Sequence, residues 1–386
     1  MTPPEPPEPH WPLEPGTCLG VIGGGQLGRY FVLAARRLGF DTAVLDPDPA
    51  APAMQLGDTT IVAAYDDAQA LEALASRCHA VTLEFENVPA GALETLARRV
   101  PVFPRPEHVA IAQDRRLEKR LAAEQGLATA RWQAIEGEGD AAAPDPACLP
   151  GILKTARLGY DGKGQCTVHS AEEVLAAWQS FGRVDCVLEE RLTLVAELSA
   201  IVVRARDGRA VVYPPAENVH RHGILHTSTV PARSPPELLE RAATQAVRLA
   251  DAMDYVGVLA IEYFVVDDGT GAQLRFNEMA PRPHNSGHWT LDACQTSQFE
   301  QQARVLAGWP AGSVRLLSPV SMLNLLGGDG LPERVRAALT REGAALHLYG
   351  KRASRPGRKM GHVNCLDANR DRALDIATSL HEASRD

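Results

Sequence analysis

The chain has 386 residues, of which 45% are hydrophobic and 23% are charged, and its formal net charge is -9. The length predicts a globular protein of two or three domains, and the acidic balance argues against a duplex nucleic-acid binder, whose surface would be basic. Seven cysteines without a C-x-x-C pair predict reduced thiols in a cytoplasmic protein. No apolar run approaches the ~20 residues of a membrane span, so we expect no membrane partner.

The first sixteen residues are rich in Pro and Glu and contain no basic or apolar block. This composition is unlike a signal peptide. We expect a disordered tail over residues 1–16.

Ordered structure is predicted to begin at Thr17 with a strand over 18–22, a glycine turn, a helix over 29–38 and a strand over 41–46. Gly23, Gly25 and Gly28 satisfy G-x-G-x-x-G, and Asp46 lies where a ribose-binding acid would fall. One hypothesis is therefore an NAD(P)-dependent oxidoreductase. The alternative is a βαβ turn that presents a helix N-terminus to another anion or to a carboxylate.

The alternation continues with strands over 59–62 and 80–86 and helices over 66–77 and 90–98. Strands that alternate with helices predict a parallel sheet. Ligands of such sheets bind at the carboxyl ends of the strands, where Gly23–Gly28 and Glu84–Asn87 both lie.

A charged amphipathic helix over 113–126 leads into a new region, in which 131–147 reads as a strand followed by a polar surface loop. Ile152 and Leu153 form a short buried strand with Lys154 at its end, and Gly159–Gly164 follows with three glycines. Glycines allow backbone N–H groups to approach a phosphate closely, although no Walker A motif is present. A flexible hairpin tip with a solvated lysine is the alternative.

The next elements are a helix over 171–181 and strands over 186–190, 197–203 and 210–213. The last two strands are joined at Asp207-Gly208, a turn signal. The change from alternating strands and helices to hairpins predicts a second, antiparallel domain.

A further hairpin joins a strand over 256–266 to one over 273–279, and a centre near Thr270 sets Glu262 opposite Glu278. Opposed residues have Cβ atoms ~4.5–5.5 Å apart, so two carboxylates there would repel each other. A hard divalent cation such as Mg²⁺ would resolve the conflict, with phosphate oxygens and waters as further ligands. The alternative is a slipped register that leaves one glutamate in solvent.

Two polar segments follow the hairpin. His284 and His288 have helical metal-ligand spacing, but the nearby prolines and Asn-Ser-Gly argue against a helix, so we reject zinc and expect a substrate surface. The stretch Lys351–His362 is a basic cluster in an acidic chain. It is read either as a phosphate clamp or as a solvated turn.

Together these residues resemble the ATP-grasp superfamily and, more narrowly, the N5-carboxyaminoimidazole ribonucleotide synthetase family of purine biosynthesis. The resemblance covers about residues 17 to 370, and its most specific part is His284–Thr290. The family often has glycine where this chain has Leu158, which could stiffen the loop. The segments that carry the resemblance are Gly23–Arg29, Lys154, Gly159–Gln165, Asn218–Leu225, Asn277–Arg282, His284–Thr290 and Arg355–His362.

The resemblance implies a mixed α/β and α+β fold with three parts after the tail. These are a Rossmann-like pre-ATP-grasp domain over 17–112, an ATP-grasp domain over 113–312 with a mobile lid at about 120–188, and a small β-rich C-terminal domain over 313–386 that binds the substrate phosphate.

The resemblance also implies the site residues. Lys154, Tyr160, Arg282 and His284 would serve catalysis. ATP would be held by Arg115, Lys154, Gly159, Tyr160, Asp161, Gly162, Lys163, Gly164, Gln165, Glu189, Glu190, Arg191, Leu192, Glu197, His220, Asn277 and Glu278. Glu262 and Glu278 would bind Mg²⁺, with two ions possible. Bicarbonate and the ribonucleotide would be held by Arg282, His284, Asn285, Ser286, Lys351, Arg358 and Lys359, with Gln26 and Glu84 contributed by the first domain.

The implied activity is that of a ligase that uses ATP and bicarbonate to carboxylate 5-aminoimidazole ribonucleotide. The partners would be these small molecules and a second copy of the chain in a homodimer. Another ATP-grasp carboxylate-amine ligase is the first alternative, and the NAD(P)-binding oxidoreductase is the less favoured one.

Overall fold

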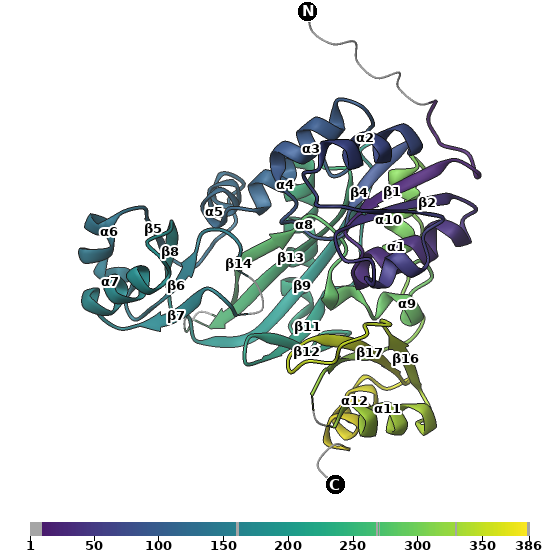
Figure 1. Cartoon of the computed structure of the whole chain (residues 1–386). Helices are drawn as coiled ribbons and strands as arrows, with labels where there is room; N and C mark the ends of the chain where they lie inside the picture. The colour runs from purple at the N-terminus through teal and green to yellow at the C-terminus, as the bar shows by residue number, and fades with distance from the viewer. Residues whose placement is uncertain (1–9, 160–161, 268, 270, 329, 384–386) are drawn as a thin grey trace, which may run out of the picture.

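The computed structural model describes residues 10–159, 162–267, 269, 271–328 and 330–383. Its first module is a parallel sheet in the order β3-β2-β1-β4, at the upper right of Figure 1. The module's elements are β1 (Cys18–Ile22), α1 (Gln26–Arg37), β2 (Asp41–Asp46), the 3₁₀ helix η1 (Pro52–Gln55), β3 (Thr59–Val62), α2 (Ala68–Arg77), β4 (Ala80–Leu83), α3 (Ala90–Ala97) and α4 (Pro106–Ala112).

Both faces of this sheet are covered, which is why β1 and β4 consist of buried residues throughout. The helices α2 and α3 pack on one face through Leu74 and Leu93. On the other face, Phe31 of α1 shares a core with Leu306 of α10 (Gln298–Leu306), which belongs to the next module. The two modules are therefore joined by a common hydrophobic core.

The expectation of a disordered tail over residues 1–16 is wrong for its last part. Leu13 is only 3% exposed, its N–H donates to the Ala307 carbonyl at 2.8 Å, and its own carbonyl accepts from the Trp309 ring N–H at 2.8 Å. Trp11 and Leu13 are apolar, unlike the Pro and Glu residues around them, and their burial against α10 stabilises this segment.

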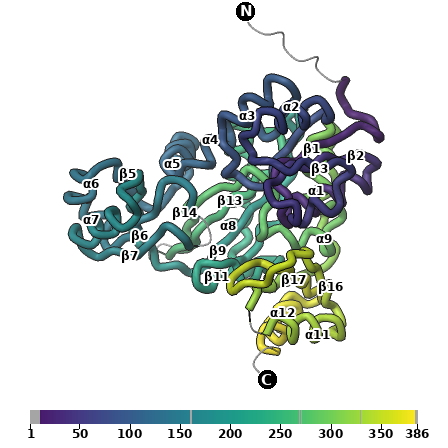
Figure 2. The backbone as a smooth tube through the Cα atoms, viewed as in Figure 1, coloured from purple at the N-terminus to yellow at the C-terminus, as the bar shows by residue number. Residues whose placement is uncertain are grey.

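A small antiparallel sheet in the order β5-β8-β6-β7 follows, and Figure 2 shows that it stands apart from the parallel sheet. Its core holds Leu153, Val174, Trp178 and Leu188. The module contains β5 (Trp132–Ile135), α6 (Glu138–Ala142), the 3₁₀ helix η2 (Pro146–Cys148), β6 (Gly151–Thr155), β7 (Gln165–Val168), α7 (Ala171–Ser180) and β8 (Cys186–Glu190), and α5 (Arg115–Glu124) precedes it. Part of the expected surface loop over 131–147 is thus helical.

The largest sheet runs in the order β14-β13-β9-β11-β12-β15-β17-β16, with β10 paired to β9. The helix α8 covers one face near β9 and β13 through Leu238 and Leu249. The elements are β9 (Leu194–Arg204), β10 (Ala210–Val212), β11 (Ala216–Arg221), β12 (Ile224–Val230), α8 (Pro236–Ala252), β13 (Gly257–Asp267), β14 (Ala272–Ala280), the 3₁₀ helix η3 (Asn285–Gly287), α9 (Thr290–Ala293), β15 (Val320–Leu326), α11 (Leu331–Thr340), β16 (Ala344–Leu348), β17 (Lys359–Leu366) and α12 (Arg370–Glu382).

The C-terminal strands extend this sheet because β15 pairs with β12, and α11 and α12 pack on them at the bottom of Figure 1. The predicted combination of a parallel N-terminal sheet with antiparallel sheets is confirmed. Within the described ranges, none of the helices is both long enough and apolar enough to span a bilayer.

Candidate functional site

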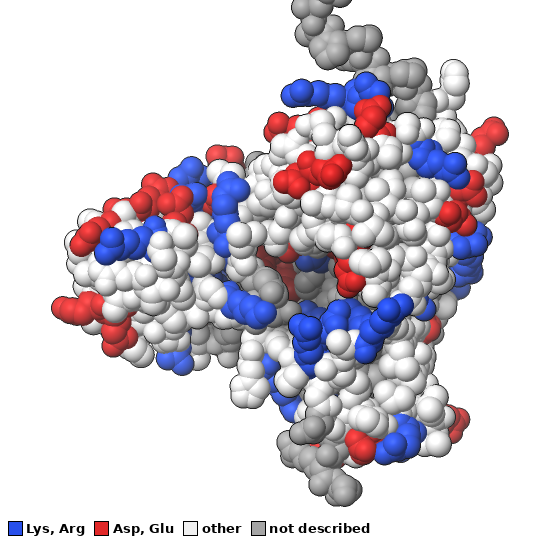
Figure 3. Space-filling model, viewed as in Figure 1, with Lys and Arg blue, Asp and Glu red and all other residues white. Residues whose placement is uncertain are grey.

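Two adjoining cavities lie between the three sheets. Figure 3 shows the hollow, with acidic side chains inside it and Lys and Arg side chains along its lower rim. The larger cavity has a volume of about 560 Å³ and the smaller one about 220 Å³. The residues that line both are Arg115, Glu262, Glu278, His284, Asn285 and Lys359, so the acidic pair lies where the cavities meet.

The register of the β13–β14 hairpin sets Glu262 opposite Glu278, as predicted. The agreement depends on a β-bulge that the sequence did not reveal. From the turn, the ladder pairs Asp267 with Ala272 and continues in step to Tyr263 and Phe276, and then shifts by one residue. Without that shift Glu262 would face Asn277, and Glu278 would point to the other side of the sheet.

The environment of the two carboxylates differs. Burial would raise the pKa of Glu278, but the Arg115 guanidinium, which donates to Glu278 Oε2 at 2.7 Å, lowers it to about 2. Burial and then the charge of Glu278 raise the pKa of Glu262 to about 7, and His284 Nε2 lies 3.5 Å from Glu262 Oε1. The fold therefore brings together two carboxylates whose repulsion a further cation would relieve.

The oxygens around this pair suit a hard divalent cation. Among the described residues, the buried Oδ1 atom of Asn277 has no hydrogen-bond partner, and Asn277 lines the smaller cavity beside Glu278. No group of three His, Cys, Asp or Glu side chains within the described ranges could hold a metal. Two carboxylates and one amide oxygen leave ligand positions for waters and phosphate oxygens, as Mg²⁺ prefers.

The smaller cavity collects most of the residues predicted for the nucleotide. His220 Nδ1 lies 2.8 Å from Glu197 Oε2. Lys154 was expected to emerge at the end of its strand, but it lies inside β6 and is only 6% exposed, facing this cavity. The predicted nucleotide residues that line the cavity are Arg115, Lys154, Gly162, Lys163, Gln165, Glu197, His220, Asn277 and Glu278.

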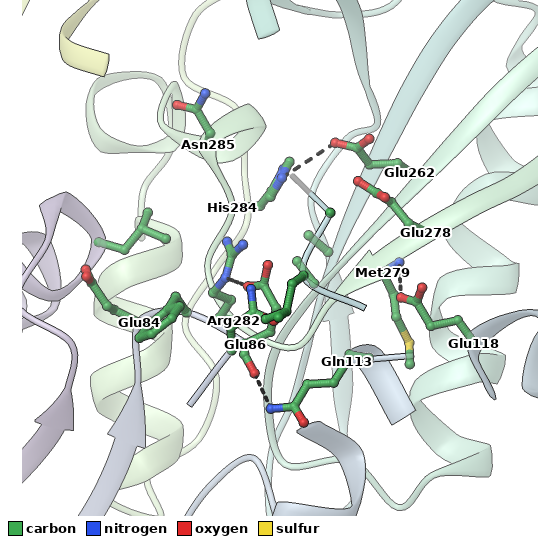
Figure 4. Close-up of a pocket in the computed structure, with 18 of the residues that line it drawn as sticks. Glu84, Glu86, Gln113, Glu118, Glu262, Glu278, Met279, Arg282, His284 and Asn285 are labelled. Carbon is green, nitrogen blue, oxygen red and sulfur yellow. Dashed lines mark hydrogen bonds and ion pairs between the residues drawn. The ribbon is translucent and has the colours of Figure 1, made fainter. Parts of the chain in front are cut away.

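The larger cavity collects most of the predicted substrate residues, several of which Figure 4 shows. Arg282 forms an ion pair with Glu86, and Gln113 donates to the Glu86 carbonyl at 2.6 Å. Glu86 links the first module to the second and was not predicted as a site residue. The predicted substrate residues that line the cavity are Gln26, Glu84, Arg282, His284, Asn285 and Lys359.

Comparison with known proteins assigns this arrangement to a family. A ribonucleotide synthetase preATP-grasp domain matches residues 17–113, an ATP-grasp domain matches residues 120–299, and a phosphoribosylaminoimidazole carboxylase C-terminal domain matches residues 320–375. The chain is 47% identical over 354 residues to the N5-carboxyaminoimidazole ribonucleotide synthase of Brucella melitensis, with 91% of this chain and 96% of the relative covered.

The chain belongs to the N5-carboxyaminoimidazole ribonucleotide synthase family. The corresponding enzyme of Bacillus subtilis is 39% identical, with 95% of this chain and 96% of that protein covered. A crystal structure of a family synthetase with ADP has a TM-score of 0.89 at 40% identity, covering 96% of this chain and 98% of that one. The Aspergillus clavatus enzyme in complex with ADP and 5-aminoimidazole ribonucleotide has a TM-score of 0.87 at 29% identity, covering 96% and 99%.

Some residues expected from the family lie outside these two cavities. Glu189 is buried against lysines, Glu190 accepts from the Arg131 N–H at 2.7 Å, and Arg191 and Leu192 follow them without lining either cavity. Their role at the adenine stays a prediction. Tyr160 and Asp161 lie outside the described residues.

Three predicted substrate residues also lie away from the cavities. Ser286 is fully buried, and its Oγ atom lies 2.9 Å from His284 Nδ1, so it contacts the site residue His284 directly. Arg358 donates to the Ala353 carbonyl at 2.8 Å. Lys351 Nζ lies 5.5 Å from the centre of the Tyr349 ring. Of the predicted basic clamp, Lys359 is the residue that lines both cavities.

The structure argues against the dinucleotide alternative because the glycine loop is already occupied by the protein's own carboxylates. Glu84 accepts from the Gly25 N–H at 2.5 Å and from the Gly28 N–H at 2.7 Å. Asp46, the residue expected to bind a ribose, accepts from the Gly24 N–H at 2.6 Å. These carboxylates occupy the helix N-terminus where a pyrophosphate would bind.

The two histidines that were considered for zinc have separate surroundings. His284 faces Glu262, whereas His288 is fully buried with its ring 4.7 Å from that of His362. Burial, followed by the charges of Arg282 and Lys359, lowers the pKa of His284 to about 3, so its imidazole is neutral.

The helix α5 contributes two buried ionisable residues that sequence reasoning missed. Glu118 is 4% exposed and Lys119 is 1% exposed, and with Arg115 they form one inward face of the helix. The signal was their spacing at i, i+3 and i+4 from Arg115, which places all three on one side. Charged residues on a helix face solvent far more often than the core, so this spacing alone does not identify Glu118 and Lys119 as buried.

Proposed function

We propose that this chain catalyses the ATP- and bicarbonate-dependent carboxylation of 5-aminoimidazole ribonucleotide to N5-carboxyaminoimidazole ribonucleotide, with release of ADP and phosphate. The observation that carries the proposal is the meeting of the two cavities at Glu262 and Glu278. One cavity collects phosphate-binding side chains and the other collects the family's acceptor residues. The family relatives named above support the same reaction.

In the first step, bicarbonate attacks the terminal phosphoryl group of ATP, which gives carboxyphosphate and ADP. Glu262 and Glu278, with Asn277, would hold Mg²⁺, which supplies charge neutralisation for the phosphoryl oxygens. Lys154 and Arg115 place fixed positive charge on the nucleotide side of the acid pair, where phosphoryl transfer is stabilised chiefly by electrostatics.

In the second step, the exocyclic amine of the ribonucleotide takes the carboxyl group from carboxyphosphate or from CO₂ released by it. Arg282, fixed by Glu86, lies beside the neutral His284 in the larger cavity. His284, whose pKa is lowered to about 3, is a weak base, so its Nε2, which lies nearest the acid pair, is suited to a hydrogen bond rather than to proton uptake. The proton that the amine loses leaves with the released phosphate. Lys359, at the rim shared by both cavities, is suited to the substrate phosphate.

Exclusion of water is needed because carboxyphosphate hydrolyses readily. Gly162 lies against the β11–β12 turn, where a Cβ atom on it would meet the Gly223 Cα atom at 3.4 Å. The glycine-rich segment and this turn therefore meet above the smaller cavity, which both of them line.

The test measures ADP release with Mg-ATP and bicarbonate, with and without 5-aminoimidazole ribonucleotide. We expect ribonucleotide-stimulated ADP formation in the wild type and in Glu94→Gln, an exposed control, and its loss in Glu278→Gln. Formation of ADP without any effect of the ribonucleotide would point to another ATP-grasp ligase, which a panel of amine acceptors would identify. No ADP with any acceptor would refute the proposal. A homodimer and a cytoplasmic location remain predictions, and light scattering checks the first.

A further inference from the structure

A single buried carboxylate is shared by two lysines behind the smaller cavity. Glu189 Oε2 lies 3.2 Å from Lys154 Nζ, and Glu189 Oε1 lies 3.1 Å from Lys119 Nζ. The side chains of Glu189, Lys119 and Lys154 are 4%, 1% and 8% exposed. At such burial, charges persist only when they are paired.

The two lysines differ in what they can reach. Lys154 lines the smaller cavity, whereas Lys119 lines neither cavity. Lys119 comes from α5 and Lys154 from β6, and Glu189, on the adjacent strand β8, lies between them. Lys119 therefore influences a ligand in the cavity only through its neighbours.

The charges of this group can be added directly. Burial alone would raise the pKa of Glu189, but Lys154 and then Lys119 lower it to about 2, so the carboxylate is ionised. Burial lowers the pKa of Lys119, and the charge of Glu189 acts in the opposite direction. With both lysines protonated, two ammonium groups and one carboxylate leave one net positive charge. Loss of Lys119 would leave Lys154 as the ammonium in contact with Glu189. Arg115 also lowers the pKa of Glu189, but it donates its hydrogen bond to Glu278.

We propose that Lys119 is a positioning residue for the nucleotide site. It compensates the charge of Glu189 and so leaves the ammonium group of Lys154 available to the phosphates of ATP. The inference rests on the proposed function, because it assigns the smaller cavity to the nucleotide. In this proposal Lys119 does not contact the ligand, but it determines the net charge of the group that faces the ligand.

A double-mutant cycle of the wild type, Lys119→Met, Glu189→Gln and the double variant tests the proposal, with Mg-ADP affinity measured by isothermal titration calorimetry on the full chain. Lys119→Met keeps most of the side-chain volume and removes the charge, and we expect it to weaken ADP binding by about tenfold or more, because charges act strongly in a site shielded from water. Lys119→Arg keeps the charge and should bind ADP more tightly than Lys119→Met. Lys119→Met combined with Glu189→Gln restores one net positive charge and should recover most of the loss.

The cycle also separates the alternatives. If Lys119→Met melts at a lower temperature but binds ADP as the wild type does, Lys119 is only structural and the proposal is wrong. If the double variant binds no better than Lys119→Met, Lys119 does not act through Glu189, and the proposal is again wrong. If the wild type itself binds no ADP, the proposed function fails before this inference is reached.

If Lys119→Met does not fold, the comparison moves to the Glu189→Gln background. The proposal requires that removal of Lys119 there changes ADP affinity by less than about threefold, because the carboxylate that it compensates is gone. A loss there of about tenfold would overturn the proposal.

Discussion

Glu118 is a buried carboxyl group whose ionisation the fold opposes. Burial raises its pKa from 4.5 to about 8, although Arg115 acts in the opposite direction, and its Oε1 atom accepts from the Met279 N–H at 3.0 Å. Between pH 4.5, the ordinary pKa that applies to the unfolded chain, and about pH 8, the folded protein holds a proton on Glu118 that the unfolded chain releases. The free energy of unfolding therefore falls as the pH rises. At pH 7 the cost is on the order of 3 kcal/mol.

Glu118→Gln replaces this group by a neutral amide of the same shape, whose carbonyl can still accept from Met279. We expect the variant to match the wild type near pH 5 and to be more stable at pH 7 by up to about 3 kcal/mol. The difference in the free energy of unfolding between the variant and the wild type should grow by about 1.4 kcal/mol for each pH unit between about pH 5 and pH 8.

Thermal melting of the wild type, Glu118→Gln and the exposed control Glu94→Gln, from pH 5 to pH 8.5, measures this effect. We expect a gain of a few degrees in melting temperature for Glu118→Gln at neutral pH, and a control that follows the wild type throughout. A gap that does not change with pH, or a variant that is less stable at pH 7, would show that Glu118 is ionised in the folded protein. Arg115 and Lys119 would then outweigh its burial.

Three further substitutions test other parts of the structure. In Gly28→Ala the new Cβ atom would lie 2.4 Å from the Gly23 carbonyl oxygen, so we expect a loss of about 1–3 kcal/mol in denaturant unfolding; unchanged stability would contradict the turn geometry. Leu13→Ala should cost about 2–3 kcal/mol, whereas a disordered tail would leave the melting temperature unchanged. Arg282→Met leaves the partly buried Glu86 without its cation and should cost about 1–3 kcal/mol. It should also raise KM for the ribonucleotide more than KM for ATP. Equal effects on the two KM values would argue against its place on the acceptor side.

Local sequence patterns predicted the fold elements well because the signal for each element comes from residues that are adjacent in the sequence. The strands over 18–22, 41–46, 59–62 and 186–190 are confirmed to the residue, since short runs of apolar or β-branched residues bounded by glycines or charges leave little choice. Ends set by distant contacts were missed. The strand expected over 80–86 ends at Leu83, and Glu84 turns away to accept two N–H groups from the glycine loop.

The candidate site was predictable where residues of one chemical type come together. It was less predictable where charged residues, which usually face solvent, are buried. The pairing of Glu262 with Glu278 was predicted, but the shift in the ladder that produces it depends on how β13 and β14 pack. Glu118 and Lys119 were missed because charged residues on a helix are solvated far more often than buried. Only their contacts with β14 and β8, distant in the sequence, show that they face inward.

The continuous sheet from β14 to β16 has a consequence for synthesis on the ribosome. The strand β12 pairs on one side with β11, its immediate predecessor, but on the other with β15, which is made only after α8, the β13–β14 hairpin and α10. Until then the edge of β12, rich in β-branched residues, can pair with strands of other chains. A nascent or truncated chain that ends before Val320 should therefore aggregate unless a chaperone binds it. Once the last seventy or so residues leave the ribosome, β15 can pair with the exposed edge of β12.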